Sequence, residues 1–375
     1  MRLSIPAALV AFIALLTPGA TAQTIVADGD DLVAVVAAAT SGDVIQIDSN
    51  STFHGTIVPT GKTLTIEAGL GFAPTLKGSD NDNCVRIIPN VAGTNTTLRG
   101  LRLEAGDGAI GPGPWPSLVL QSWGTVAYSA DLFVEDCVIE GIVVIFGNYE
   151  ADCDVTLLNT VLEDNMNLSG TYTTPVDIEV IGCEIAGPVV ATCSPHLGIP
   201  RLMDLKLVRT LFRKEVDLNA SGGASLNVEI DSCIVDGSMS APTPPFGLRV
   251  YADTAGTITN TTVTGCKNAI QGQPGVSWHN MLISGNVTDL VNVLPGEIEY
   301  SLIEDGTYDG VDNNFGGTAL FDDSWALLAC SPGVDAGSNA APFLGAVDFS
   351  GGPRILDNDA DGTSTINVGA VEHTG

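Results

Sequence analysis

Four carboxylates and one amide recur at matching positions of a repeating segment. The positions hold Asp131, Asp154, Asp177, Asp204 and Asn227. Stacked carboxylates raise each other's pKa unless a cation or backbone N–H groups compensate. One interpretation is a calcium-binding stripe with Asp154, Asp177 and Asp204 as ligands. The other is a ladder of turn-capping side chains, each accepting hydrogen bonds from its own corner.

Five of the 14 basic residues gather in one copy of the segment: Arg201, Lys206, Arg209, Arg213 and Lys214. Aligning the copies places Lys206 between Glu179 and Glu229, and Arg213 beside Asp236. Such pairs form cross-strand ladders, each of which contributes little stability.

Arg209 is the exception, because it occupies a bend position where the other copies favour Asn or Gly. A strained arginine beside an aspartate ladder is an arrangement that β-elimination on a uronate would use. Calcium would neutralise the uronate carboxylate, and Arg209 or Lys206 would remove the proton at C5. This hypothesis makes Arg209 and Lys206 the candidate catalytic residues.

A second set of acidic residues lies near the C-terminus. Asp357, Asp359 and Asp361, followed by Gly362, form D-x-D-x-D-G, the first half of a calcium loop. The twelfth position is Val368, where an EF-hand requires a bidentate glutamate, so the motif is not an EF-hand. The two interpretations are a calcium site completed by a glutamate or a carbonyl, and an acidic surface turn.

A long insertion supplies candidate aromatic contacts. It is rich in Gly and Pro, precedes the copy at Cys137, and contains Trp115 and Trp123. Loops of this kind form the walls of grooves, where an indole can stack on a sugar ring. We therefore predict Trp115, Trp123 and the cationic Arg213 as substrate-binding residues. The alternative is that the two indoles anchor their own loop to the fold.

The element that must position these residues is the repeat itself. Its anchor positions are Cys137, Thr160, Cys183, Thr210 and Cys233, at steps of 23, 23, 27 and 23 residues. Apolar and outward residues alternate within each copy with the two-residue period of a strand. After one turn residue, the alternation shifts by one position. Strands joined by one-residue corners at this period predict an all-β fold, a single-stranded right-handed parallel β-helix. The expected corner column is Asp136, Asn159, Gly182, Arg209, Ser232, Asn260 and Asn280.

The ends of the chain differ from the coils. Residues 1–22 have the charged start, short apolar run and Ala-Thr-Ala site of an export signal, which predicts cleavage after Ala22 and a secreted or cell-surface protein. Residues 23–80 are expected to form an N-terminal cap with a short capping helix within 28–48 and strands at 56–58, 63–66 and 75–76. Coils are expected over 81–315 and a C-terminal cap over 316–375. No second apolar stretch is long enough to span a membrane.

Eight cysteines in an exported chain suggest disulfides, but the repeat argues against them for three. Cys137, Cys183 and Cys233 lie two coils apart, near 9.6 Å at about 4.8 Å per coil, so they should be buried free thiols. The pairing of the others is left open: Cys84, Cys153, Cys193, Cys266 and Cys330. A net charge of −30 disfavours nucleic acid and anionic lipid as partners.

Both ends of the chain carry a resemblance to a known family. The opening, with its helix, GD, strand and KTLTI run, resembles the N-terminal cap of secreted pectin-lyase-like right-handed β-helix proteins. The runs SPGVDAG (331–337), DFSGGPR (348–354) and NVGAVE (367–372) resemble the C-terminal segment of exported bacterial β-helix proteins of the choice-of-anchor Q type. Asn367 replaces the usual acidic residue. The resemblance implies architecture and export, and it implies little about chemistry.

Three functions fit these observations. The first is an exported monomeric module that binds a polysaccharide or a cell-surface glycan, stiffened by Ca²⁺. The second is a calcium-dependent polysaccharide lyase, and the third is a purely structural stalk or adhesin. The four histidines show no metal spacing, and the expected coils (81–315) lack the adjacent aspartates of polygalacturonases, so hydrolysis of that type is not expected.

Overall fold

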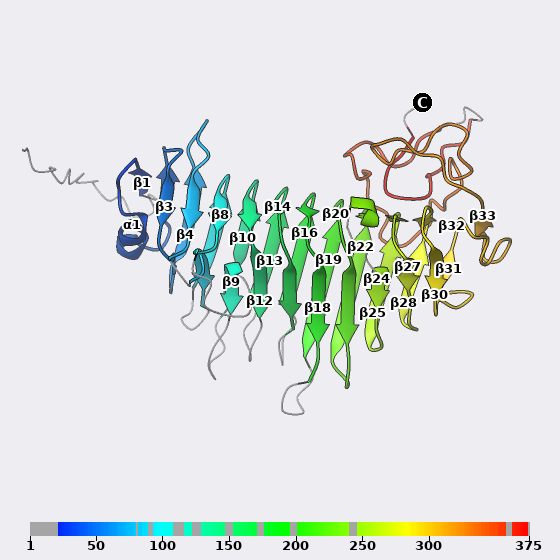
Figure 1. Ribbon diagram of the computed structural model, residues 1–375, viewed down its shortest axis with the longest axis horizontal. Coiled ribbons are helices and arrows are strands. Elements are labelled where there is room, and N and C mark those ends of the chain that lie inside the picture. Colours follow the sequence, from blue (N-terminus) through cyan, green and yellow to red (C-terminus); the bar gives the residue numbers. More distant parts are fainter. Residues whose placement is uncertain are drawn as a thin grey trace, which may run out of the picture.

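The chain winds into a right-handed parallel β-helix, seen in a computed structural model (Figure 1). The structure describes residues 22–79, 82–88, 93–107, 116–121, 129–146, 153–170, 176–195, 201–239, 246–357 and 362–373. Three parallel sheets of 12, 12 and 9 strands form its sides. The predicted all-β solenoid is therefore confirmed. The predicted export signal lies, apart from Ala22, outside the described residues.

The first sheet, sheet A, carries four of the predicted site residues: Asp154, Asp177, Asp204 and Lys206. Its strands are β1 (Gln23–Val26), β2 (Val44–Ile47), β4 (Thr63–Ala68), β7 (Asn95–Arg99), β10 (Leu132–Glu135), β13 (Cys153–Leu158), β16 (Val176–Ile181), β19 (Leu202–Val208), β22 (Ser225–Asp231), β25 (Thr254–Thr259), β28 (Val276–His279) and β31 (Ile298–Glu299). Inward and outward residues alternate along these strands, because successive side chains of a strand point to opposite faces.

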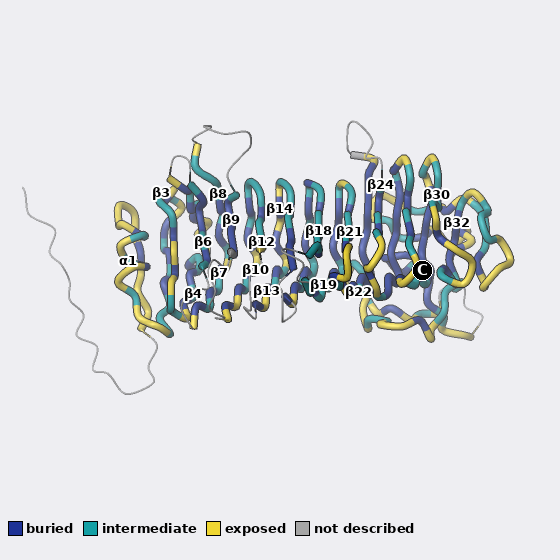
Figure 2. Tube along the Cα trace, turned by 90° about the horizontal axis from the view of Figure 1, so that it is seen from below, coloured by how far each residue is buried: buried dark blue, intermediate teal, exposed yellow. Residues whose placement is uncertain are grey.

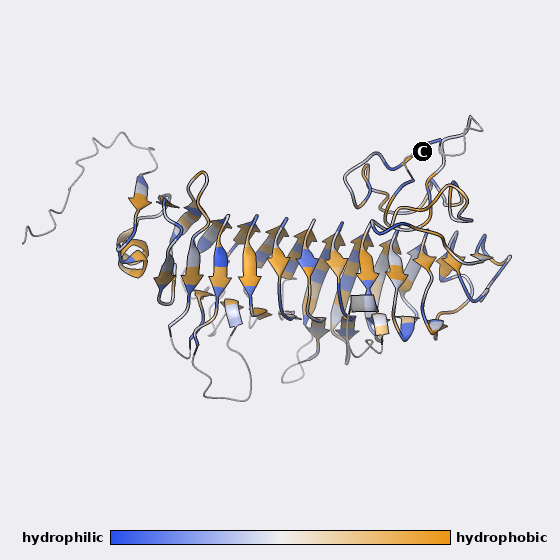
Figure 3. Ribbon diagram, turned by 45° about the horizontal axis from the view of Figure 1, so that its top comes forward, coloured by the Kyte–Doolittle hydropathy of each residue, from blue (hydrophilic) through white to orange (hydrophobic). Residues whose placement is uncertain are grey.

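Sheets B and C complete each coil. Sheet B contains β3 (Thr52–His54), β5 (Thr75–Lys77), β8 (Arg102–Glu104), β11 (Val138–Glu140), β14 (Val161–Leu162), β17 (Glu184–Ile185), β20 (Leu211–Phe212), β23 (Ile234–Asp236), β26 (Thr262–Thr264), β29 (Leu282–Ile283), β32 (Leu302–Ile303) and β33 (Phe315–Gly316). Sheet C contains β6 (Val85–Ile87), β9 (Pro116–Gln121), β12 (Ile142–Phe146), β15 (Met166–Ser169), β18 (Val189–Cys193), β21 (Val216–Ala220), β24 (Phe246–Val250), β27 (Asn268–Gln271) and β30 (Thr288–Val291). Apolar residues are concentrated on the strands (Figure 3), and every coil contains buried residues (Figure 2).

From β7 to β31, one left-handed residue lies at the corner between each strand of sheet A and the next strand of sheet B. All seven positions of the predicted corner column have φ between 48° and 65°. Asn, Asp and Gly adopt these angles at low cost, which explains their recurrence there. The corner column is therefore confirmed, and it contains one arginine, Arg209, at φ 49°.

The helix α1 (Leu32–Ala38) lies at the N-terminal end of the coils (Figure 1). Asp31 caps it, accepting a hydrogen bond from the Ala34 N–H at 3.0 Å. The Lys62 ammonium donates to two carbonyls of its last turn, at 3.1 and 2.7 Å. Leu32 and Val36 are buried in the main core. The predicted capping helix is thus confirmed.

One predicted strand is wrong. Residues 56–58 form no strand, and Ile57 makes only an isolated bridge to Val85. The strands of this coil are β2 and β3, and β3 ends before Gly55, where φ is 129° and the chain turns. The strands predicted at 63–66 and 75–76 correspond to β4 and β5.

All eight cysteines are free. Cys137, Cys183 and Cys233 are buried, as predicted, and burial raises the pKa of the Cys137 and Cys183 thiols to about 12 and about 11. The pKa of the Cys233 thiol is raised for the same reason. Of the five cysteines whose pairing the sequence left open, only Cys330 is exposed.

We therefore expect one fast-reacting thiol in the native protein. Thiolate is the reactive form, so buried thiols with raised pKa values should react with Ellman's reagent only on unfolding. Native protein should release one equivalent of chromophore, and protein in guanidinium chloride eight. A Cys330→Ser variant should reduce the native value to zero. Fast reaction of two or more thiols in the native state would contradict the buried cysteine column.

The residues after β33, here called the C-terminal segment, fold back over the outer face of sheet B (Figure 1). Outward Leu282 and Leu302 pack against Ala319, Leu327 and Val368. Further back along the coils, outward Leu211 and Ile234 pack against Ala370 and Val371. This part of sheet B is therefore buried on both faces.

A buried polar cluster fixes the C-terminal segment to the corner column. Arg354 is 1 % exposed and pairs with Glu372 at 3.0 Å. Its guanidinium also donates to the carbonyls of Gly369 and Ala370, at 3.0 and 3.1 Å, and to the Ser232 hydroxyl. The Asp348 carboxylate accepts from the Glu372 N–H at 2.9 Å. Asp348 and Arg354 of the 348–354 motif and Glu372 of the 367–372 motif thus form one cluster. Arg354 joins this cluster to the corner residue Ser232.

Candidate functional site: a groove on sheet A

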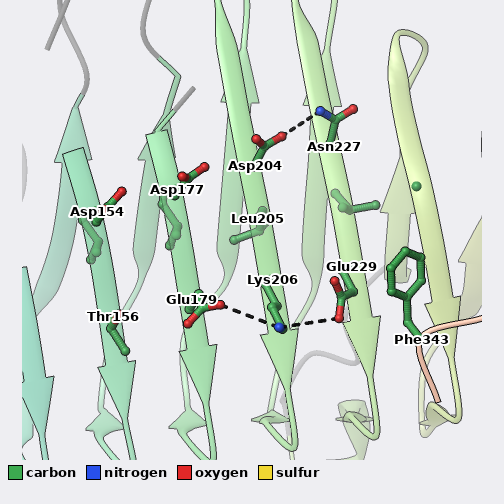
Figure 4. Close-up of a pocket in the computed structure, with 14 residues that line it drawn as sticks. Asp154, Thr156, Asp177, Glu179, Asp204, Leu205, Lys206, Asn227, Glu229 and Phe343 are labelled. Carbon is green, nitrogen blue, oxygen red and sulfur yellow. Dashed lines mark hydrogen bonds and ion pairs between the residues drawn. The ribbon is translucent and has the colours of Figure 1, made fainter. Parts of the chain in front are cut away.

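A groove of about 630 Å³ crosses the outer face of sheet A. It is lined by residues of β13, β16, β19 and β22, by Gly256 of β25, and by Phe343 of the C-terminal segment (Figure 4). The strands run across the groove, so its length follows the axis of the β-helix. An extended ligand would therefore contact successive coils in turn.

The acidic column lies along this groove. Asp154 pairs in register with Asp177, Asp177 with Asp204, and Asp204 with Asn227. Neighbouring strands are about 4.8 Å apart, so the carboxylates repeat at about that spacing. The Asn227 amide donates to the Asp204 carboxylate at 2.7 Å (Figure 4). Asp131 directly precedes β10, one coil before Asp154.

A second row of charges runs parallel to the acidic column, two residues further along each strand. The Lys206 ammonium lies 3.7 Å from Glu179 and 3.7 Å from Glu229 (Figure 4), the pairing that the aligned copies predict. The three side chains are between 31 and 45 % exposed, so the pairs contribute little stability. To act as a base, Lys206 would first have to leave both carboxylates.

The structure does not bring Arg209 to the acidic column. Arg209 follows β19 at the corner, five residues after Asp204, which corresponds to roughly 16 Å along a strand. It is not among the residues that line the groove. A Cβ placed on Gly351 of the C-terminal segment would lie 4.0 Å from the Arg209 guanidinium. The side chain therefore points toward the docked segment.

Because Arg209 has the left-handed angle that asparagine tolerates better, we expect Arg209→Asn to stabilise the protein by about 1 kcal/mol. The matched control is Asn159→Arg, at the same φ of 49° in the same column, which should destabilise by a similar amount. Urea denaturation measures both. Destabilisation by Arg209→Asn would show that contacts of the guanidinium outweigh the backbone strain.

Arg213 also lies away from the groove. It follows β20 of sheet B and pairs with Glu184 at 3.0 Å and, as predicted, with Asp236 at 3.1 Å. Its guanidinium lies over the ring of Trp325, 5.5 Å from the centroid, so it contacts the C-terminal segment. Trp115 and Trp123, the other predicted substrate-binding residues, lie outside the described residues.

The second predicted calcium motif is described in part. Asp357 is exposed, and its carboxylate accepts from the Gly362 N–H at 3.1 Å. Asp359 and Asp361 lie outside the described residues. Within the described part of the chain, no three His, Cys, Asp or Glu side chains are placed to share one metal ion. Calcium at either acidic set therefore stays a prediction.

Phe343 is the groove residue that the sequence did not reveal. Its side chain is 58 % exposed and lies at the end of the groove beside β25 (Figure 4). Its φ is 55°, in the region that bulky residues rarely adopt. Phe343 belongs to no repeat copy, so only an apolar residue within a turn-rich stretch could have drawn attention to it.

Fold and groove together define the class: a right-handed parallel β-helix protein with an acidic groove on one sheet. Comparison with protein-family models finds no match, and comparison with curated proteins finds none that is significant. No helix within the described ranges is both long and apolar enough to cross a membrane.

Proposed function

We propose that this protein is an exported β-helix module that binds carbohydrate in the groove on sheet A, outside the cell or at its surface. The observation that carries the proposal is the groove itself, where polar side chains and an exposed aromatic ring share one concave surface. Sugars are recognised by such combinations, with hydrogen bonds to hydroxyls and an apolar ring face against an aromatic side chain. The signal-like residues 1–22 support export.

The shape of the groove favours a chain of sugars over a single sugar. It is lined by three residues of each of four strands and by one residue of a fifth, and neighbouring coils offer similar groups at about 4.8 Å intervals. Asp177, Asp204 and Asn227 present carboxylate and amide oxygens to hydroxyl groups in succession. A linear oligosaccharide lying along the axis would use the repetition of the fold.

The test is binding of the mature protein to a panel of soluble oligosaccharides, measured by isothermal titration calorimetry. Phe343→Ala should weaken binding of the best ligand about tenfold, because the ring supplies the apolar contact. Phe146→Ala is the matched control, since Phe146 is an exposed phenylalanine of sheet C, and it should leave the affinity unchanged. If no oligosaccharide binds, or if both variants behave alike, the proposal fails.

A second candidate is a calcium-dependent uronate lyase, supported by the presence of Lys206 in the same groove as Asp154, Asp177 and Asp204. In this proposal the carboxylates would hold Ca²⁺, and Lys206 in its neutral form would accept the C5 proton as the C4–O glycosidic bond breaks and a C4–C5 double bond forms. A uronate-polysaccharide panel with calcium, followed by the ultraviolet absorbance of unsaturated products, tests it. Turnover that disappears in Lys206→Met would favour the lyase. A chelator-sensitive melting temperature without turnover would favour a calcium-braced binding module.

A further inference from the structure

The groove carries a strong excess of negative charge. Five carboxylates line it: Asp154, Asp177, Glu179, Asp204 and Glu229. Lys206 is the only cation among the lining residues, which leaves an excess of four negative charges. Arg201 lies three residues before Asp204 and donates to the Ser169 hydroxyl at 2.6 Å. Counting Arg201 with the groove still leaves an excess of three.

We infer that the groove binds a linear glycan that carries protonated amino groups, an amino-sugar oligomer, rather than a polyuronate. The inference rests on the proposed function and adds the charge of the ligand. A polyuronate would place its carboxylates against those of the groove and would need an intervening cation. A protonated amino sugar reverses the sign of the interaction, so the same carboxylates attract it.

Two rows of carboxylates give this attraction a geometry. One row contains Asp154, Asp177 and Asp204, and the other contains Glu179 and Glu229 with Lys206 between them. The rows are two residues apart along the strands, about 6.6 Å, and both run along the groove. A sugar chain lying between them can direct an ammonium group to either row, while Phe343 receives an apolar ring face at one end.

The same surface is poorly suited to a cationic peptide. Extended peptides are recognised mainly by adding a strand to a free sheet edge. The strands under the groove, β13, β16, β19 and β22, each pair with a neighbour on both sides, so they offer no free edge. What the groove does offer, side-chain oxygens and an aromatic ring, suits hydroxyls and sugar rings.

The experiment compares four hexamers at low ionic strength by calorimetry with the mature protein: β-1,4-linked glucosamine, its fully N-acetylated form, galacturonate with and without calcium, and lysine. Below the pKa of its amines, the glucosamine hexamer should bind at least tenfold more tightly than the acetylated one. Added sodium chloride should reduce that difference, because the groove is open to solvent.

Matched variants separate the groove from the general acidity of the protein. Asp177→Asn should weaken binding of the glucosamine hexamer about fivefold more than it weakens binding of the acetylated hexamer. Asp323→Asn removes the same charge from an exposed residue outside the groove lining and should change neither affinity. Equal effects of the two variants would mean diffuse attraction, and the inference would be wrong.

The remaining outcomes are also decisive. Equal affinity for both glucosamine forms overturns the inference and leaves carbohydrate binding standing. Tighter binding of galacturonate with calcium overturns it in favour of the second candidate function. Tightest binding of the lysine hexamer overturns it in favour of a peptide ligand. If no hexamer binds, this inference fails, and the wider oligosaccharide panel decides the proposed function.

Discussion

Replacing Arg354 with methionine is expected to lower the free energy of unfolding by about 3–5 kcal/mol. Methionine fills similar space but removes the cation that pairs with Glu372 and donates to the Ser232 hydroxyl. Glu372 is 1 % exposed, so a buried carboxyl would remain without its cation, next to the equally buried Asp348 (2 % exposed). Urea denaturation, followed by the fluorescence of Trp325 in the C-terminal segment, measures the loss.

The matched control is Arg99→Met. Arg99 also pairs with a glutamate, Glu135, at 2.8 Å, but its side chain is 47 % exposed. Water compensates the partner of an exposed pair, so this variant should lose less than about 1 kcal/mol. If Arg354→Met costs no more than Arg99→Met, the buried cluster does not hold the C-terminal segment on the coils.

The cost of Arg354→Met should also depend on pH. Burial raises the pKa of Glu372 from 4.5 to about 7, against the opposing effect of Arg354. A raised folded-state pKa contributes stability that is present below pH 4.5 and lost as the pH rises through about 7. Without Arg354 the pKa of Glu372 should rise further. The stability deficit of the variant should therefore be larger at pH 8 than at pH 5, and a deficit that shrinks with pH would contradict this account.

The coils could be predicted because each position of a β-helix stacks on the same position of the next coil. One copy therefore reports on the others, and aligning the copies placed Lys206 between Glu179 and Glu229. The same alignment predicted the register of Asp154, Asp177 and Asp204. Because coils stack at a fixed spacing, residues that align between neighbouring copies lie next to each other in the structure.

The C-terminal segment could not be predicted in this way. It has no repeat, and its contacts join residues far apart in the chain, such as Arg354 and Ser232, which are 122 positions apart. Its motifs indicated a resemblance to the C-terminal segment of a known family, but not which face of the β-helix this segment covers. One signal was present: Leu211, Ile234 and Leu282 are apolar at outward positions, which indicates a covered sheet face. Phe343 reaches the groove only through this docking, so it was missed as well.

Gly256 lines the groove and also lies against the backbone of the neighbouring coil. Gly256→Ala is expected to lower the free energy of unfolding by about 3 kcal/mol or more. A Cβ there would lie 1.9 Å from the Val228 carbonyl oxygen and 2.8 Å from two other backbone atoms of Val228. Backbone cannot swing aside as a side chain can, so β22 and β25 would have to separate. The φ of 138° adds strain for any residue with a side chain. Because Gly256 lines the groove, the variant should also weaken oligosaccharide binding.

Comparison with Gly223→Ala separates the cost of backbone strain from the cost of a steric clash. Gly223 also has a positive φ, 85°, but a Cβ there meets nothing within 4 Å, so only the backbone strain of about 1 kcal/mol should appear. Thermal and urea unfolding of both variants give the difference, which measures how tightly neighbouring coils approach at the end of the groove. Equal costs would mean that β25 can move away from β22 without penalty. In that case the end of the groove at Gly256 would not be held at the spacing of the coils.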